Sequence, residues 1–148
     1  MTANALSIRH ARQEDAGAIA HLAGLLGHAA EPDDIARRLR KLLDDPTEVV
    51  FVACDEDDRV HGYIAAEQRL MLESGAMVEI VGLSVDPDHR RGGAGRALLT
   101  AAELWAHKRG VARLRVRANS LRDDAHLFYP AMGYTRDKTQ YCYTHQLG

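Results

Sequence analysis

The sequence is poor in cysteine, in long apolar runs and in excess charge of either sign. Its two cysteines, Cys54 and Cys142, are too few for a disulfide framework. The longest apolar runs, such as residues 49–54, are too short to cross a bilayer, and residues 1–12 lack the layout of a signal peptide. A formal net charge of −2 excludes strong bulk attraction to nucleic acid or to an anionic membrane. We therefore expect a cytosolic protein.

The sequence also lacks repeats, low-complexity tracts and linkers rich in proline, glycine and serine. Its composition, 46% hydrophobic and 27% charged, is ordinary for a soluble globular protein. A length of 148 residues suits one domain and is too short for two ordinary ones. We therefore predict a single domain over residues 1–148.

The spacing of apolar residues predicts alternating strands and helices. We expect helices at about 14–26, 32–44, 93–109 and 120–132, the last beginning at Ser120. We expect strands at 6–11, 48–54, 60–67, 77–85, 112–118, 133–136 and 140–146. This order of elements implies a mixed α/β sheet with helices on both faces.

The most informative stretch is the turn between the strand at 77–85 and the helix at 93–109. Residues 90–96 read Arg-Arg-Gly-Gly-Ala-Gly-Arg, which is neither a Walker loop nor a dinucleotide fingerprint. Backbone N–H groups at a helix start carry partial positive charge, and glycines let a phosphate approach them closely. Additional positive charge comes from Arg90, Arg91 and Arg96. The stretch favours pyrophosphate binding over the alternative, a glycine-rich turn whose arginines only face solvent.

Two motifs resemble those of the GNAT superfamily of acyl-CoA-dependent N-acyltransferases. Residues 90–95 resemble its Arg/Gln-x-x-Gly-x-Gly/Ala signature, and they follow a strand that ends Leu-Ser-Val at 83–85. Downstream, Asn119 precedes Ala-His-Leu-Phe-Tyr at 125–129 and Met-Gly-Tyr at 132–134, which is similar to the family's second motif. Both motifs occur in the order that the family has.

The resemblance implies an α/β fold with a GNAT-like mixed, mostly antiparallel sheet of about seven strands and helices on both faces. It also implies acetyl-CoA as cosubstrate. In the family, the strand before the signature splays from its neighbour and its backbone pairs with the pantetheine arm, and Gly82 lies where such a break is easy. The cofactor-binding positions implied in this chain are Leu83, Ser84, Val85, Arg90, Arg91, Gly92, Gly93, Ala94, Gly95, Arg96, Asn119 and Tyr129.

Glu79 is the candidate general base. It interrupts an apolar strand, and alternation predicts that it shares a face with Val81, Leu83 and Val85. A carboxylate in apolar surroundings has a raised pKa, which suits a base at neutral pH. The resemblance places Glu79 where histone-type members of the family carry their base. Two alternatives stay open: Glu79 only orders a water, or it pairs with an arginine from a neighbouring strand.

Tyr129 is the candidate general acid. The resemblance places it near the cofactor sulfur, and a phenol with a pKa near 10 can share a proton with the leaving thiolate. Its alternative role is an aromatic packed beside Phe128. Pro130 removes a helix hydrogen bond directly after it, which is expected to turn the tyrosine slightly. Asn119 is implied to hold the pantetheine amides, or a water between them and Tyr129, and is otherwise a turn residue.

Other polar residues give weaker signals. His21 and His28 have helical spacing, but no acid or cysteine completes a ligand set, so we predict no metal site. Ser84 has no base at a recognisable spacing, which argues against a serine hydrolase. We predict that the alternating arginines of the strand at 112–118 face solvent; they are Arg113, Arg115 and Arg117.

Together these features favour an N-acetyltransferase that moves the acetyl group of acetyl-CoA to a primary amine of a small molecule by direct attack. The resemblance places acceptor recognition at about residues 21–38 and 69–75. Acids there, and Glu67, could attract a cationic amine. A peptide or protein N-acetyltransferase stays open, as does a non-catalytic acyl-CoA-binding or regulatory module. The resemblance also allows a homodimer, and neither nucleic acid nor membrane is an expected partner.

Overall fold

The chain divides into two compact units, Met1–Val116 and Arg117–Gly148. The computed structural model describes residues 5–119 and 121–148, apart from the side chain of Arg91. The predicted helix start at Ser120 therefore lies outside the described residues. Among the helices that the structure describes, none is long and apolar enough to cross a membrane.

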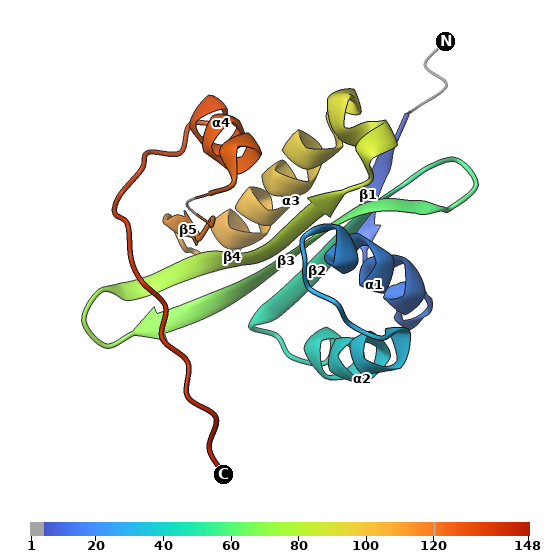
Figure 1. Cartoon of the computed structure of the whole chain (residues 1–148). Coiled ribbons are helices and arrows are strands. Elements are labelled where there is room, and N and C mark those ends of the chain that lie inside the picture. Colours follow the sequence, from blue (N-terminus) through green and yellow to red (C-terminus); the bar gives the residue numbers. More distant parts are fainter. Residues whose placement is uncertain (1–4, 120) are drawn as a thin grey trace. The chain divides into compact units, whose positions relative to one another are not determined.

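One mixed sheet forms the centre of the first unit, with its strands in sequence order (Figure 1). The strands are β1 (Ser7–His10), β2 (Glu48–Cys54), β3 (Val60–Met71), β4 (Gly75–Val85) and β5 (Leu114–Val116). Strands β1 to β4 pair antiparallel, and β5 pairs parallel to β4. The mixed, mostly antiparallel sheet is therefore confirmed.

Helices cover both faces of this sheet, as predicted. They are η1 (Gln13–Asp15), α1 (Ala16–Leu25), α2 (Pro32–Leu43), η2 (Pro87–Gly92) and α3 (Ala94–Lys108). On one face, Val50 and Val52 of β2 pack with Leu22 of α1 and Leu39 of α2. On the other face, Leu98 of α3 is fully buried and approaches β3 so closely that a Cβ at Gly62 would lie 3.1 Å from its Cδ1.

A β-bulge interrupts β4 at Val81. Ala65 of β3 lies opposite Gly82, but the next residue, Ala66, lies opposite Ile80, so Val81 is an extra residue and is exposed. A Cβ at Gly82 would lie 3.3 Å from the Tyr63 ring. Glycine thus lets the aromatic ring pack against the strand beside the bulge.

The bulge changes which residues of β4 share a face. Opposite residues of paired strands lie on the same face. Alternate β3 residues Tyr63, Ala65 and Glu67 have as partners Ser84, Gly82 and Glu79. The prediction that Glu79 shares a face with Leu83 and Val85 is therefore wrong, because strict alternation does not allow for an inserted residue, and Val81 itself has no partner on β3.

The prediction of about seven strands is also wrong, since the described residues form five. The second unit contains α4 (Asp123–Ala131), and the described residues that follow it form no strand. The predicted strands at 133–136 and 140–146 are missing, and Tyr141 and Tyr143 are exposed. Alternating residues favour extended backbone, but a strand forms only where its N–H and C=O groups find a partner edge.

Candidate active site

The edge of β4 that faces β5 is open along its last residues. The β4–β5 pairing ends where Ile80 lies opposite Val116, whereas β4 continues to Val85. Among the residues that the structure describes, no strand pairs with 81–85 on this side. Backbone N–H and C=O groups here are available to an extended ligand. The pairing with β5 thus ends beside the bulge at Val81, and the expected splay of two strands stays a prediction.

Side chains at the end of β4 hold the open edge in place. The Ser84 hydroxyl is buried and donates to the carbonyl oxygen of Leu22 in α1 at 2.8 Å. The Arg90 Nε donates to the carbonyl oxygen of Val85 at 3.0 Å. The Ser84 hydroxyl thus fastens a helix to the sheet, which leaves only the backbone of Ser84 for a ligand.

The turn from β4 into α3 has the geometry of an anion cradle. Gly93 precedes α3 with φ of 83°, a left-handed conformation that favours glycine. No side chain caps the helix start, and Ala97 N–H makes a hydrogen bond to the carbonyl oxygen of Gly93 at 2.9 Å. The N–H groups of the first turn therefore point outward with partial positive charge. Arg96 is exposed beside them.

Glu79 is buried, but its surroundings are not apolar. Its Oε1 accepts hydrogen bonds from Arg115 Nη2 at 2.6 Å and Nε at 3.2 Å. Arg69 Nη1 lies 3.4 Å from the same oxygen. The expectation of an apolar environment for this carboxylate is therefore wrong. The alternative, pairing with an arginine from a neighbouring strand, is what the structure has, and Arg115 is not the solvent-facing residue that its alternation predicts.

Glu79 belongs to a row of charged residues across the sheet. Glu48 of β2 lies opposite Glu67 of β3, which lies opposite Glu79, which lies opposite Arg115. Partial burial, together with the nearby charge of Glu67, raises the pKa of Glu48 from 4.5 to about 7. Sequence reasoning missed Glu48, although alternation with Val50 and Val52 places it on the same face. On this face, covered by α1 and α2, three carboxylates therefore lie beside two guanidinium groups, because Arg69 contacts Glu67 and Glu79, and Arg115 contacts Glu79.

In the second unit, Tyr129 is held among aromatic rings of its own helix and turn. Its ring centroid lies 5.1 Å from that of Phe128 and 5.8 Å from that of Tyr134. Burial raises the pKa of Tyr129 above its ordinary value of 10. The helix continues through Pro130 to Ala131. The phenol is therefore positioned by packing and stays protonated at neutral pH.

Asn119 forms a turn before this helix. Its Oδ1 accepts a hydrogen bond from the backbone N–H of Leu121 at 2.9 Å, and its carbonyl oxygen accepts one from Arg122 N–H at 2.9 Å. These contacts fit the turn alternative for Asn119, because an Asx turn uses the side-chain oxygen. Its amide nitrogen takes no part in either contact. Contact with pantetheine stays a prediction.

Comparison with known proteins identifies the family. The model of the acetyltransferase (GNAT) family matches residues 8–134. Aminoglycoside N(6')-acetyltransferase type 1 of Stenotrophomonas maltophilia is 34% identical over 140 residues, which are 90% of this chain and 89% of that protein. The chain belongs to the GNAT acetyltransferase family. The resemblance inferred from the two motifs is thereby confirmed.

Solved structures confirm the GNAT fold. The crystal structure of aminoglycoside 6'-N-acetyltransferase AAC(6')-Ih from Acinetobacter baumannii has a TM-score of 0.85 and 18% identity, over 97% of this chain and 100% of that one. AAC(6')-Iy in complex with the bisubstrate analogue CoA-S-monomethyl-acetylneamine has a TM-score of 0.85 and 17% identity, over 97% of this chain and 99% of that one. At these identities the likeness concerns the fold.

Family and fold together define the class of reaction. The chain is an acetyl-CoA-dependent N-acetyltransferase of the GNAT family. The open edge of β4 and the glycine-rich start of α3 are the features of the first unit that suit a cosubstrate with an amide-bearing arm and a pyrophosphate. From here the question is which amine is acetylated and by which residues.

Proposed function

We propose that this acetyltransferase acetylates an amino group of an aminoglycoside-like polycation. The observation that carries the proposal is the row of carboxylates from Glu48, Glu67 and Glu79 on the sheet face under α1 and α2. Arg69 and Arg115 offset part of this charge, and several ammonium groups on one acceptor would offset the remainder more completely than a single amine. The names of related acetyltransferases point to the same class of acceptor.

We propose that acetyl-CoA binds along the open edge of β4, with its pyrophosphate at the start of α3. Backbone groups of Leu83, Ser84 and Val85 would pair with the pantetheine arm, and an N–H near Leu83 would face the thioester oxygen. The pyrophosphate would meet the helix N–H groups and nearby guanidinium groups. The residues assigned to the cradle are Arg90, Arg91, Gly92, Gly93, Ala94, Gly95 and Arg96, and Asn119 is assigned to the pantetheine amides.

In the proposed reaction the neutral amine attacks the thioester carbonyl directly. A C–N bond forms, the carbonyl carbon becomes tetrahedral, and the C–S bond then breaks to release CoA thiolate. We assign Tyr129 as the acid, because its phenol is protonated at neutral pH and can supply a proton to the thiolate. We assign Glu79 as the acceptor of the amine proton through a water, with Arg115 orienting its carboxylate.

The test is the release of CoA thiol from acetyl-CoA in the presence of matched acceptors. The panel contains an aminoglycoside with a 6'-amino group, its analogue with a 6'-hydroxyl group, a linear polyamine and a peptide with a free N-terminus. We expect rapid release with the 6'-amino compound and background release with its hydroxyl analogue. Preference for the peptide or the linear polyamine would overturn the acceptor class.

The same experiment separates an enzyme from a binding module. Tight binding of acetyl-CoA without thiol release for any amine would overturn the proposed catalysis and favour a non-catalytic acyl-CoA-binding role. Cytosolic location and a homodimer also stay proposals. Cell fractionation tests the location, and light scattering of the purified protein tests the dimer.

A further inference from the structure

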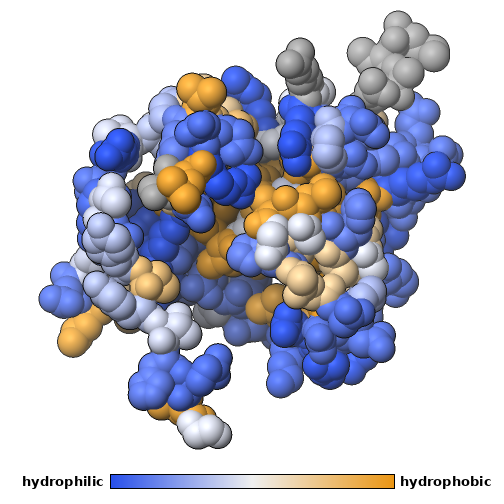
Figure 2. Space-filling model, in the orientation of Figure 1, coloured by the Kyte–Doolittle hydropathy of each residue, from blue (hydrophilic) through white to orange (hydrophobic). Residues whose placement is uncertain are grey.

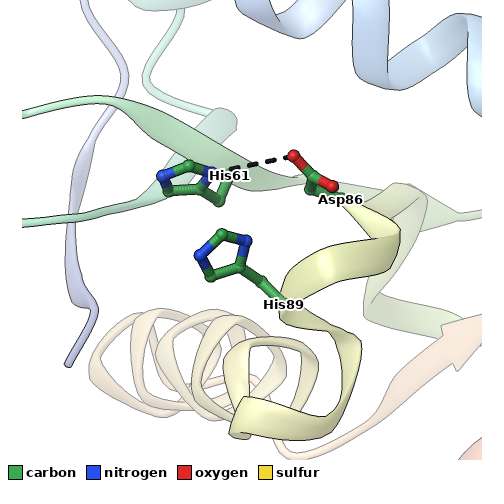
Figure 3. A group of neighbouring side chains, drawn as sticks. All are labelled: His61, Asp86 and His89. Carbon is green, nitrogen blue, oxygen red and sulfur yellow. Dashed lines mark ion pairs between the residues drawn. The ribbon is translucent and has the colours of Figure 1, made fainter. Parts of the chain in front are cut away.

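A cluster of two histidines and an aspartate lies in the first unit, and none of the three side chains is assigned to acetyl transfer. His61 comes from the beginning of β3, Asp86 follows β4 directly, and His89 comes from η2 (Figure 3). One ligand atom from each side chain lies within 4.8 Å of the other two. All three side chains are partly buried. Sequence spacing gave no signal for this group, because β4 separates His61 from the other two residues.

A neighbouring carboxylate fixes the orientation of His61. The Nε2 of His61 lies 2.7 Å from Oδ2 of Asp55, whose Oδ1 accepts the backbone N–H groups of Asp57 and Arg59. A charged carboxylate can only accept, so Nε2 carries the hydrogen and the lone pair of a neutral His61 lies on Nδ1.

Two ring nitrogens and a carboxylate oxygen therefore lie close together inside the cluster. His61 Nδ1 lies 3.7 Å from Asp86 Oδ2, while Asp86 Oδ1 is occupied by the backbone N–H of Asp88. The His89 ring stacks on the His61 ring with centroids 3.9 Å apart. Within the part of the chain that the structure describes, His89 Nδ1 is buried and has no hydrogen-bond partner. Lone pairs at this spacing repel unless a cation lies between them.

We propose that His61, Asp86 and His89 bind a divalent first-row transition metal, with Zn²⁺ as the representative ion. Two imidazole nitrogens and one carboxylate oxygen suit such an ion better than Ca²⁺ or Mg²⁺, which prefer oxygen ligands. Ligand atoms of a tetrahedral zinc site are about 3.4 Å apart. The His61–Asp86 pair is close to that spacing, and small side-chain rotations bring the third ligand in. Asp55 is the outer carboxylate that orients a ligating histidine.

Charge supports this choice of ion. Asp55 and Asp86 contribute two negative charges, and two histidines in their neutral form contribute none. One divalent ion balances the cluster. A water would complete the fourth position, as in sites with three protein ligands.

Because of the position of the cluster, a metal bound there would affect the proposed acetyl-CoA site. Asp86 and His89 lie at the beginning and middle of η2, which leads through Gly92 into the glycine-rich start of α3. Their backbones are also joined, because His89 N–H donates to the Asp86 carbonyl oxygen at 2.9 Å. A metal that ties both side chains to β3 would fix this turn. We therefore expect Zn²⁺ and CoA to strengthen each other's binding by the same factor.

The test is calorimetric titration of untagged, chelator-stripped protein with Zn²⁺. The wild type should bind one equivalent. His89→Gln and Asp86→Asn should bind at least tenfold more weakly, and Asp86→Asn keeps the oxygen that caps η2. Asp55→Asn should weaken binding by about 10- to 100-fold, as expected for the partner of a ligating histidine. Thermal melting of each variant confirms that it is folded.

Matched controls locate the binding. Two variants at exposed positions should bind Zn²⁺ like the wild type. They are His107→Gln, at an exposed histidine of α3, and Cys142→Ser, at the exposed free cysteine. Tyr129→Phe should also bind Zn²⁺ normally, so the metal site and the proposed acetyl transfer can fail separately. Absence of saturable binding by the wild type, or unchanged affinity in His89→Gln and Asp86→Asn, would overturn the site. Equal affinity for CoA with and without Zn²⁺ would overturn the link to the cradle.

Discussion

At the residue scale, the two proposed proton-transfer groups differ in what holds them. Tyr129 is placed by aromatic packing, whereas Glu79 is placed by charged hydrogen bonds from Arg115 and Arg69. Removing the Tyr129 hydroxyl leaves the packing intact. Removing the charge of Glu79 leaves a partly buried guanidinium without its counter-charge. Their substitutions should therefore have different effects on stability.

Tyr129→Phe should lower kcat by about 100-fold or more, because the thiolate then leaves without its proton donor. Thiol release under saturating acetyl-CoA measures the effect, and the Kd of acetyl-CoA should change little. Tyr141→Phe, at an exposed position, is the matched control and should keep full activity. Wild-type kcat in Tyr129→Phe would remove this residue from the mechanism.

Glu79→Gln should lower both activity and stability. We expect a loss of about 1–3 kcal/mol in the free energy of unfolding, because Arg115 stays partly buried without a charged partner. We also expect kcat to fall, since the proton acceptor is gone. Chemical denaturation and kcat under saturating substrates measure the two effects.

The control for this change is Glu56→Gln, in the exposed turn between β2 and β3. Adding Arg115→Gln to Glu79→Gln should recover part of the stability but none of the activity. A variant that is destabilised but has an unchanged kcat would show that Glu79 is structural only.

At the element scale, facing glutamates on β2 and β3 make the sheet sensitive to pH. The pKa of Glu48 in the folded protein is about 7, above its ordinary 4.5, so the folded state holds more protons between these values. The stability that a protonated Glu48 contributes is complete below about pH 4.5. It is lost as pH rises through about 7. The pair is therefore most unfavourable when both carboxylates are charged.

Glu48→Gln should raise the free energy of unfolding at pH 8 by about 1 kcal/mol and leave it nearly unchanged at pH 5. Urea denaturation at both pH values measures the difference. Glu73→Gln, away from this pair, should show no such dependence. If Glu48→Gln raised the free energy of unfolding equally at pH 5 and pH 8, the result would contradict a raised pKa of Glu48.

The start of α3 depends on a left-handed residue at Gly93. Gly93→Ala should lower the free energy of unfolding by about 1–2 kcal/mol and weaken CoA binding, because a Cβ disfavours the positive φ that shapes the cradle. Gly17→Ala is the control, since Gly17 lies in α1 with open space around it and should gain about 0.5–1 kcal/mol. Unchanged CoA affinity in Gly93→Ala would contradict the proposed pyrophosphate site.

At the scale of the whole molecule, charge is nearly balanced in total but unevenly arranged. The net charge is −2, and hydrophilic residues cover much of the face in Figure 2. Within the first unit, basic residues collect at the start of α3, and three carboxylates with two paired arginines, Arg69 and Arg115, lie on the sheet face under α1 and α2. This separation suits an anionic donor and a cationic acceptor that meet at one sheet.

The KM of a polycationic acceptor should therefore rise several-fold between low and physiological salt, where the Debye length falls from about 30 to 8 Å. The kcat should stay unchanged, because salt screens the approach of the acceptor and not the bound chemistry. A monoamine acceptor is the control and should depend less on salt. Equal salt dependence for both amines would contradict recognition by the row of carboxylates.

Contiguous features of this protein were determined by the sequence alone. The spans of β2, α2 and α3, the glycine-rich turn and the GNAT family all follow from residues that are neighbours in the chain. Helix caps, glycine positions and apolar periodicity depend only on residues within a few positions of one another. They can therefore be recognised in the sequence without knowledge of the tertiary contacts. For this reason the residues near one another in the chain were enough to propose a cradle for acetyl-CoA.

Only the tertiary structure decided which distant residues meet. The bulge at Val81 put Glu79 on the face of Ser84, and pairing with β5 gave it Arg115 as a partner. The tertiary structure also stacks the His61 ring on the His89 ring at the end of β4. The segment at 140–146 pairs with no strand among the described residues. Each outcome depends on strand register, which is fixed by packing between segments far apart in the chain.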